Sequence, residues 1–175
     1  MKKEKKQLDL GCGNTLRIRE GYQGFGVDIS TNLKNVKVAD LAIEKLPYLS
    51  NSYDLVTTYD FVEHIPFSIY YNNKKRNCVV ELFNEIYRVL KNDGIFHLEG
   101  PLYPHVNAFQ DPTHLSFWTL ESVNYFSGDY YGFHDHYGHT SRFEKIFNYE
   151  ENNRLIFELK AIKNVPTSSE YKLKY

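Results

Sequence analysis

The stretch CVVELFNEIYRVLKNDGIFHLEG, residues 78–100, holds the clearest secondary-structure signals in the sequence. Its apolar residues recur three and four positions apart as far as Leu90, which predicts an amphipathic helix. The run Asn92-Asp93-Gly94 is expected to end that helix, because all three residue types favour turns. Residues 95–99 are β-prone, so the stretch predicts a helix followed by a strand.

A second β-prone run, YDLVTTY at residues 53–59, precedes the helix. A strand, a helix and another strand in this order predict a parallel crossover, since parallel neighbours need a long covering connection. The expected fold class is therefore α/β. Three earlier runs are also β-prone: Gln7–Leu10, Phe25–Ile29 and Val36–Ala39.

The C-terminal part of the sequence predicts a hairpin. Phe143–Tyr149 and Arg154–Ile162 are β-prone and flank the turn-forming residues 150–153. We expect them to pair as antiparallel strands at the edge of the sheet. Before them, Thr119 and Ser122 give a capping signal for one short helix over residues 119–126.

Composition argues against several classes of protein. The 175 residues suit one domain, and 42% hydrophobic with 25% charged residues are ordinary globular values. A formal charge of −1 argues against a nucleic-acid partner, which usually meets a basic surface. The sequence has two cysteines and shows neither a signal peptide nor an apolar run of membrane-spanning length. We therefore expect no membrane partner and a cytoplasmic location.

Residues that suit a nucleotide-like ligand follow the first three β-prone runs. Leu8-Asp9-Leu10-Gly11-Cys12-Gly13 ends in glycines, which let a ligand approach the backbone or simply form a tight turn. Asp28 ends the second run, where a carboxylate can accept both hydroxyl hydrogens of a ribose. Asp40 ends the third run and can accept from an exocyclic amine while Leu41 packs on a base. Parallel strand ends converge, so these groups are expected to share one site.

Together with Ser52-Tyr53-Asp54-Leu55-Val56 and the tract Ile86–Gly94, these motifs resemble the class I S-adenosylmethionine-dependent methyltransferases. The resemblance covers residues 7–101 and implies a doubly wound, mostly parallel seven-stranded sheet of Rossmann type, ending in the antiparallel hairpin. It also implies that S-adenosylmethionine lies across the carboxyl ends of the first strands. The cofactor-binding residues that it implies are Asp9, Gly11, Cys12, Gly13, Asp28, Ile29, Asp40, Leu41, Tyr59 and Asp60.

In this assignment Asp9 and the two glycines line the methionine moiety, and Asp28 holds the ribose. Asp40 with Leu41 holds the adenine, while Tyr59 with Asp60 closes the pocket. A dinucleotide-dependent dehydrogenase is the weaker alternative, because Leu16 stands where Gly-x-Gly-x-x-Gly has its third glycine.

The segment between the first two strands departs from the family pattern. Residues 14–22 are too few for a full helix and contain Gly21, so we expect a loop, as in a compact subgroup of the family. Without a helix dipole, the cofactor carboxylate would depend on backbone amides and on Arg17 or Arg19. Either arginine can instead be a solvated surface residue.

The acceptor site is expected after the fourth strand and after residue 100. Glu63 and His64 are candidate acid–base groups, although they can instead shape a turn. Asp111 and His114 are the sharper pair, because the carboxylate can fix the imidazole tautomer while His114 takes a hydroxyl proton. His105 is the third catalytic candidate. The alternative is a loop tied down by its own Asp111 and His114 hydrogen bonds.

Further along, aromatic residues and histidines leave two more alternatives open. The aromatic residues between Tyr103 and Tyr137 either pack as a core or lid or form a surface on which a sugar stacks. One set of residues would suit a divalent metal: Asp111, His114, His134, Asp135, His136 and His139. Its loose spacing favours a solvated surface loop, and we assign no metal ligands.

We expect one methyltransferase domain over residues 1–175. A basic tail at 1–6 precedes a cofactor-binding half at 7–100, an acceptor segment with the hairpin at 101–163, and a second tail at 164–175. The predicted activity is methyl transfer to an oxygen or nitrogen of a small-molecule polar acceptor, such as a sugar hydroxyl. Two alternatives are a non-catalytic S-adenosylmethionine-binding partner subunit and a metal-dependent hydrolase that uses the histidines. The sequence does not determine the oligomeric state.

Overall fold

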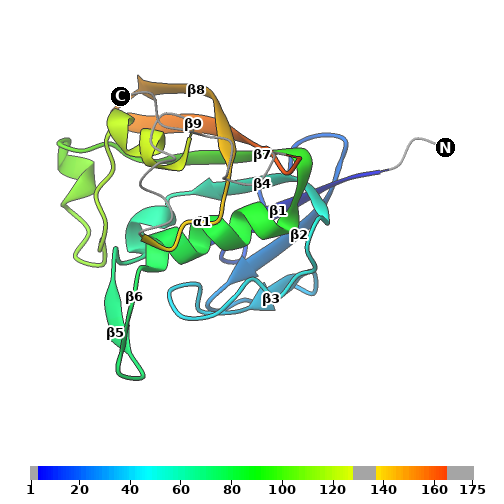
Figure 1. Ribbon diagram of the computed structural model, residues 1–175, viewed down its shortest axis with the longest axis horizontal. Coiled ribbons are helices and arrows are strands. Elements are labelled where there is room, and N and C mark those ends of the chain that lie inside the picture. The colour runs from blue at the N-terminus through cyan, green and yellow to red at the C-terminus, as the bar shows by residue number, and fades with distance from the viewer. Residues whose placement is uncertain (1–3, 128–136, 165–175) are drawn as a thin grey trace.

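The computed structural model describes residues 4–127 and 137–164. Seven strands form its main sheet, in the spatial order β3-β2-β1-β4-β7-β9-β8 (Figure 1). Their bounds are Lys5–Leu10 (β1), Tyr22–Asp28 (β2), Val36–Val38 (β3), Tyr53–Tyr59 (β4), Leu90–Pro101 (β7), Phe143–Glu151 (β8) and Arg154–Ala161 (β9). A separate hairpin contains Ile69–Tyr71 (β5) and Lys74–Arg76 (β6). The helices are Cys78–Val89 (α1) and the 3-10 helices Val62–His64 (η1), Val106–Ala108 (η2) and Leu120–Phe126 (η3).

The strand directions confirm the predicted Rossmann-like sheet. β1 pairs in parallel with β2 and β4, β2 pairs with β3, and β4 pairs with β7. β9 runs antiparallel to both β7 and β8. The chain moves outward from β1 to β3 and then returns to place β4 on the other side of β1. The carboxyl ends of β1 and β4 therefore flank the crevice in which open α/β sheets bind ligands.

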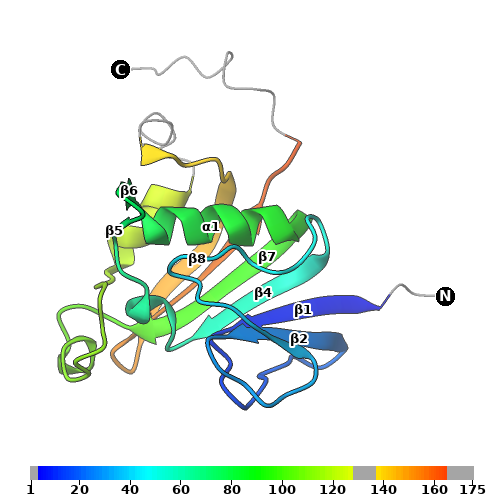
Figure 2. The same cartoon turned by 90° about the horizontal axis from the view of Figure 1, so that it is seen from below.

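The hydrophobic core lies between α1 and one face of the sheet, along which the helix runs (Figure 2). Phe83 of α1 is fully buried and stacks on Phe126 of η3, with ring centroids 3.6 Å apart. It also meets Phe96 of β7 edge-on at 5.3 Å. The spacing of the apolar residues predicted this helix correctly, because every third or fourth side chain faces the sheet.

The opposite face of β1 and β4 is covered by a loop, as the short segment 14–22 predicted. Gln7 and Asp9 point to this face and hold the loop through backbone groups of Arg17 and Arg19, at 2.8–2.9 Å. Thr57 of β4 accepts a hydrogen bond from Gln7 and donates one to Asp9. All three polar side chains are at most 1% exposed. Hydrogen-bonded polar side chains therefore hold the cover on this face of the sheet, where a full helix would pack through apolar side chains.

Two hairpins turn on pairs of asparagines. Asn152 and Asn153 connect β8 and β9 with φ values of 51° and 64°, which fits the two-residue turns that match strand twist. Asn72 and Asn73 connect β5 and β6 in the same way, with φ values of 49° and 60°. The first hairpin was predicted and the second was missed, since its strands are only three residues long and largely exposed.

Two strand boundaries and the type of one helix differ from the predictions. Lys5 and Lys6 begin β1 and do not belong to a tail. β7 begins at Leu90, so Asn92-Asp93-Gly94 lies within the strand, where Asp93 has a φ of 60°. The predicted helix after Thr119 is a 3-10 helix, with the Thr119–Ser122 capping box present. None of the helices in the described part of the chain is long and apolar enough to span a membrane.

Candidate cofactor pocket and acceptor loop

Gly11 and Gly13 form the turn at the carboxyl end of β1. Both have positive φ values, 65° and 55°, which side chains other than glycine rarely adopt. A Cβ atom on Gly11 would overlap the ring of Phe61, which follows β4. The missing side chain therefore lets the ends of β1 and β4 approach each other at the topological switch.

A cavity of about 350 Å³ opens beside this turn. Its lining includes Gly11, Cys12, Thr15, Arg17 and Tyr59. Small-molecule sites occupy roughly 300–1,000 Å³, so the cavity can hold part of a cofactor. The guanidinium carbon of Arg17 lies 5.0 Å from the centroid of the Tyr59 ring, which places a cation on the cavity wall.

The two candidate arginines have different surroundings. Arg19 is paired with Glu158 of β9 at 2.9 Å, outside this lining. Arg17 lines the cavity itself, and its backbone nitrogen is fixed by Asp9. Arg17 is therefore the better placed of the two to meet a cofactor carboxylate.

Asp28, which is predicted to hold the ribose, is the last residue of β2. Its Oδ2 accepts from the backbone nitrogen of Gly13 at 2.8 Å and its Oδ1 from that of Ser30 at 3.0 Å. Each carboxylate oxygen keeps a second lone pair for a ribose hydroxyl. Ile29, the next residue, is 68% exposed and offers an apolar surface beside that carboxylate.

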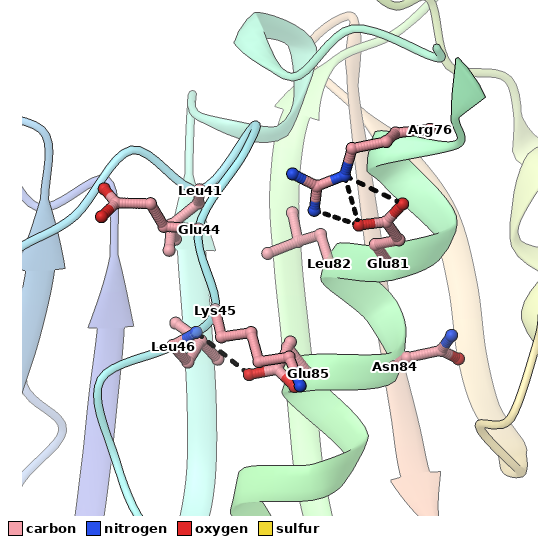
Figure 3. Close-up of a pocket in the computed structure, with 9 residues that line it drawn as sticks. All are labelled: Leu41, Glu44, Lys45, Leu46, Arg76, Glu81, Leu82, Asn84 and Glu85. Carbon is pink, nitrogen blue, oxygen red and sulfur yellow. Dashed lines mark hydrogen bonds and ion pairs between the residues drawn. The ribbon is translucent and has the colours of Figure 1, made fainter. Parts of the chain in front are cut away.

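Asp40 and Leu41, which are predicted to hold the adenine, differ in their surroundings. Asp40 accepts from the backbone nitrogen of Ala42 at 3.0 Å, so its carboxylate also stabilises a turn. Leu41 is only 7% exposed and faces a second cavity, of about 230 Å³, between residues 41–46 and α1 (Figure 3). Its side chain belongs to the core cluster, whereas Ile29 and Val38, beside Asp28, are exposed apolar residues.

Several polar side chains of this second cavity bond to the chain around it. Arg76 is hydrogen-bonded to Glu81 and donates to the carbonyl of Ile43 at 2.6 Å (Figure 3). Glu85 accepts from the backbone nitrogen of Leu46 at 3.0 Å. These bonds tie the segment that precedes β4 to α1. The walls of the cavity are therefore held together by the protein's own groups.

Asp9, Cys12 and Asp60 have structural roles within the predicted site. Both carboxylate oxygens of Asp9 already accept hydrogen bonds, and burial raises its pKa. Burial also raises the pKa of the Cys12 thiol to about 11, so it stays protonated near neutral pH. Asp60 pairs at 2.6 Å with Arg154 of β9, so its carboxylate turns toward that strand.

On the predicted acceptor side, η1 is hydrogen-bonded to the loop that follows β7. The backbone nitrogens of Leu115 and Ser116 donate to the carbonyl of Glu63 at 2.7 and 3.0 Å. The Ser116 hydroxyl donates to the carbonyl of Val62, and Trp118 donates its ring N–H to that hydroxyl. These bonds bring His114 beside His64, whose ring centroids are 5.0 Å apart.

Glu63 is buried at this contact between η1 and the loop. It is 1% exposed, and its Oε2 has no hydrogen-bond partner in the part of the chain that the structure describes. Burial raises the pKa of Glu63 to about 7, and the charge of Asp60 acts in the same direction while His114 opposes it. Gly100 makes room for this carboxylate, since a Cβ there would lie 3.3 Å from Oε2.

The two imidazoles are held through their Nδ1 atoms. Nδ1 of His114 lies 3.0 Å from the carbonyl of Ala108, which can only accept, so it carries the proton. Nδ1 of His64 lies 3.0 Å from the Thr113 hydroxyl, which itself donates to Asp111 at 2.6 Å, so it carries a proton too. The Nε2 atoms of both rings are therefore unprotonated in the neutral state.

The predicted Asp111–His114 pair needs a correction. Asp111 lies 3.9 Å from Nε2 of His114, whereas the carbonyl of Ala108 fixes the tautomer of that ring. The carboxylate instead orients His64, through Thr113. The pKa of Asp111 is lowered by its hydrogen bonds to Thr113.

His105 and His139 lie away from this pair of imidazoles. His105 pairs with Glu150 of β8 at 3.1 Å. His139 packs against Phe126 with ring centroids 5.0 Å apart and lies 3.4 Å from the Ser141 hydroxyl. His134, Asp135 and His136 fall outside the described residues. Among the described residues, the metal-ligating types that gather are instead Glu63, His64 and His114.

An aromatic surface covers the acceptor loop. Tyr103, Phe109 and Phe117 are 39–50% exposed, and Phe109 meets each of the other two with ring centroids 5.0–5.6 Å apart. Val106 and Leu115 are also exposed, at 71% and 53%. A contiguous exposed apolar patch beside polar groups is typical of a binding surface.

Comparison with known proteins identifies the family. The family model described as "Methyltransferase domain" matches residues 8–98, more than half of the chain. Solved structures with a similar fold include a complex of the Haloferax volcanii Trm112 methyltransferase activator with a protein assigned as a methyltransferase (TM-score 0.63, 13% identity, 95% of this chain and 86% of that one).

Two S-adenosylmethionine-dependent methyltransferases are also similar in fold. The one from Archaeoglobus fulgidus has a TM-score of 0.57, 20% identity, and coverage of 89% of this chain and 86% of that one. The one from Methanosarcina mazei has a TM-score of 0.58, 15% identity, and coverage of 91% and 94%. No curated protein is similar enough to match.

The residues at the strand ends fit this cofactor, since Gly11 and the cation of Arg17 line the cavity, and the carboxylate of Asp28 lies at the end of β2, bonded to the backbone nitrogen of Gly13. Membership in the family favours the predicted methyltransferase over the alternative of a metal-dependent hydrolase. The chain belongs to the methyltransferase-domain family of class I S-adenosylmethionine-dependent methyltransferases.

Proposed function

We propose that the protein methylates an oxygen of a small polar acceptor, and that a sugar hydroxyl is the acceptor chemistry that its residues suit best. The observation that carries this proposal is the unprotonated Nε2 of His114, on a ring that the Ala108 carbonyl holds through Nδ1 and that clusters with Glu63 and His64. A hydroxyl group needs such a proton acceptor, whereas an acceptor that is already ionised does not.

The cofactor half of the protein provides alignment. S-adenosylmethionine, when bound, supplies an electrophilic methyl group on a positively charged sulfur. Asp28 would hold its ribose, the amides of the Gly11–Gly13 turn and Arg17 its methionine end, and Ile29 its base. Fixed geometry of this kind supplies much of the rate enhancement when two reactants must meet in line.

The acceptor half provides the base and the surface. Nε2 of His114 would take the proton of the acceptor O–H and pass it on to water. The bound cofactor would supply the methyl carbon for the new oxygen–carbon bond, and its sulfur would keep the electron pair of the carbon–sulfur bond. The exposed rings of Tyr103, Phe109 and Phe117 suit the apolar face of a sugar.

The test is methyl transfer from labelled S-adenosylmethionine to a panel of acceptors that carry a hydroxyl, an amine or a carboxylate. We expect product with hydroxyl acceptors that have an apolar face. Calorimetric binding of the cofactor without transfer to any of the panel would favour the non-catalytic partner subunit. Rapid transfer to carboxylates alone would contradict the role of a base.

A further inference from the structure

The cluster of Glu63, His64 and His114 has the composition of a metal site. A carboxylate oxygen and one nitrogen from each imidazole all lie within 4.8 Å of one another. Glu63 and His64 come from η1, directly after β4, and His114 comes from the loop after β7. The cluster therefore lies where two neighbouring strand ends meet.

Glu63 carries an oxygen that the described residues leave unsatisfied. The residue is 1% exposed, and its Oε2 accepts no hydrogen bond from any group in residues 4–127 and 137–164. Buried polar atoms are nearly always paired, and a buried carboxylate needs a cation or a donor. A ligand bound among the three side chains would satisfy this oxygen.

The histidines are held as metal ligands usually are. Each ring donates from Nδ1, His114 to the carbonyl of Ala108 and His64 to the Thr113 hydroxyl, which leaves Nε2 as the free nitrogen. Ligating histidines almost always donate their other ring N–H to an oxygen, which fixes both the tautomer and the ring orientation. The chain from Thr113 to Asp111 extends this support.

We propose that Glu63, His64 and His114 bind one divalent transition-metal ion. Two imidazoles and one carboxylate are three protein ligands, which leaves coordination positions open for water or substrate. The imidazoles favour Fe²⁺ or Zn²⁺ over Mg²⁺ and Ca²⁺, which prefer oxygen ligands, while the carboxylate with open positions for water also suits Mn²⁺. Ligand atoms about 2.1 Å from a metal lie roughly 3–4 Å apart, so binding would draw the three side chains slightly together.

The use of this ion rests on the proposed function. An acceptor hydroxyl bound at an open position would have a lowered pKa and would release its proton to water. His114 then acts as a ligand, and the ion takes over the activation of the oxygen. The exposed carboxylate of Asp111, 3.9 Å from Nε2 of His114, can hold an acceptor hydroxyl or a water on the ion.

The test begins with binding and needs no activity. The full chain, stripped with a chelator, is titrated with Mn²⁺ and followed by the loss of the free-ion electron paramagnetic resonance signal. We expect one site per chain. Glu63→Gln, His64→Asn and His114→Asn should each weaken binding by more than about 100-fold, and Thr113→Val by roughly 10–100-fold.

Glu144→Gln is the matched control, because Glu144 is an exposed carboxylate paired with Lys160 on the β8–β9 hairpin. It should bind Mn²⁺ like the wild type, and circular dichroism should show every variant folded. If Glu63→Gln fails to fold, the two histidine variants carry the test. Wild-type protein that binds no Mn²⁺, or variants that bind as well as the control, would overturn the site.

Activity then separates this inference from the proposed function. Mn²⁺ binding at the three residues without methyl transfer to any hydroxyl supports the site and contradicts the proposed function. Transfer at the full rate in chelator overturns the catalytic role of the ion and supports His114 as the base. Transfer that requires Mn²⁺ or Zn²⁺ and is lost in Glu63→Gln supports both.

Discussion

The cofactor half and the acceptor half of this site are built in different ways. In the first, the Gly11–Gly13 turn and Asp28 lie at the ends of adjacent parallel strands, and the backbone itself makes the site. In the second, Glu63, His64 and His114 are brought together by hydrogen bonds between segments about fifty residues apart. Changes in the two halves should therefore have separable effects, on cofactor binding and on rate.

The largest expected effect is on the rate in the acceptor half. His114→Ala should lower kcat by roughly 10²–10⁴-fold, because it removes the free Nε2 whether that atom takes a proton or binds a cation. Cofactor affinity, measured by calorimetry, should stay within about twofold of wild type. A variant that loses thermal stability and cofactor binding together would show that His114 is only a tie of its loop.

The opposite pattern is expected in the cofactor half. Asp28→Ala should weaken S-adenosylmethionine and S-adenosylhomocysteine binding by roughly 10–100-fold, because each hydrogen bond to a charged acceptor contributes about 1.5–3 kcal/mol. At saturating cofactor, kcat should change little. Calorimetry that gives an unchanged affinity would remove Asp28 from the ribose site.

The sequence predicted these halves unequally for a physical reason. Most strands, α1 and the residues at the strand ends follow from local patterns, because a buried strand and the turn after it are encoded by neighbouring residues. The family resemblance implied the seven-stranded sheet, and the roles of Asp28 and the glycines remain predictions from it. The boundary error at Lys5 arose because two exposed lysines carry no apolar signal.

The acceptor half depends on contacts that no local pattern encodes. His114 was predicted as a base that Asp111 orients, but the carbonyl of Ala108 fixes its ring, and backbone oxygens leave no mark in a sequence. Glu63 was considered only as a turn former or an acid–base group, since its burial depends on Gly100, far along the chain. The sequence did offer a signal for Thr113, because its hydroxyl lies between Asp111 and His114, which were both predicted to act in the site.

The loop of residues 14–22, which covers one face of β1 and β4, can be tested through two adjacent threonines of β4. Thr57 bonds to both Gln7 and Asp9, whereas the Oγ1 of Thr58 has no partner among the described residues, and both are at most 1% exposed. Thr57→Val should lower the free energy of unfolding by roughly 1–3 kcal/mol, because it leaves buried polar groups unpaired. Thr58→Val should be neutral or stabilising. Urea denaturation that gives equal losses would mean that the polar network does not hold the loop.

The smallest expected effect compares the two arginines of that loop. Arg17 lines the cavity beside Tyr59, whereas Arg19 is paired with Glu158, so only Arg17 is free to meet the methionine carboxylate. Arg17→Ala should weaken cofactor binding by about tenfold or less, since the guanidinium is partly solvated and its pairing is screened. Arg19→Ala should change that affinity by less than about twofold, because an exposed ion pair contributes little. Sinefungin and S-adenosylhomocysteine, which both keep the carboxylate, should show the same difference between the two variants. Equal losses of affinity in both variants would mean that the overall charge of the loop attracts the ligand, and not a contact with Arg17.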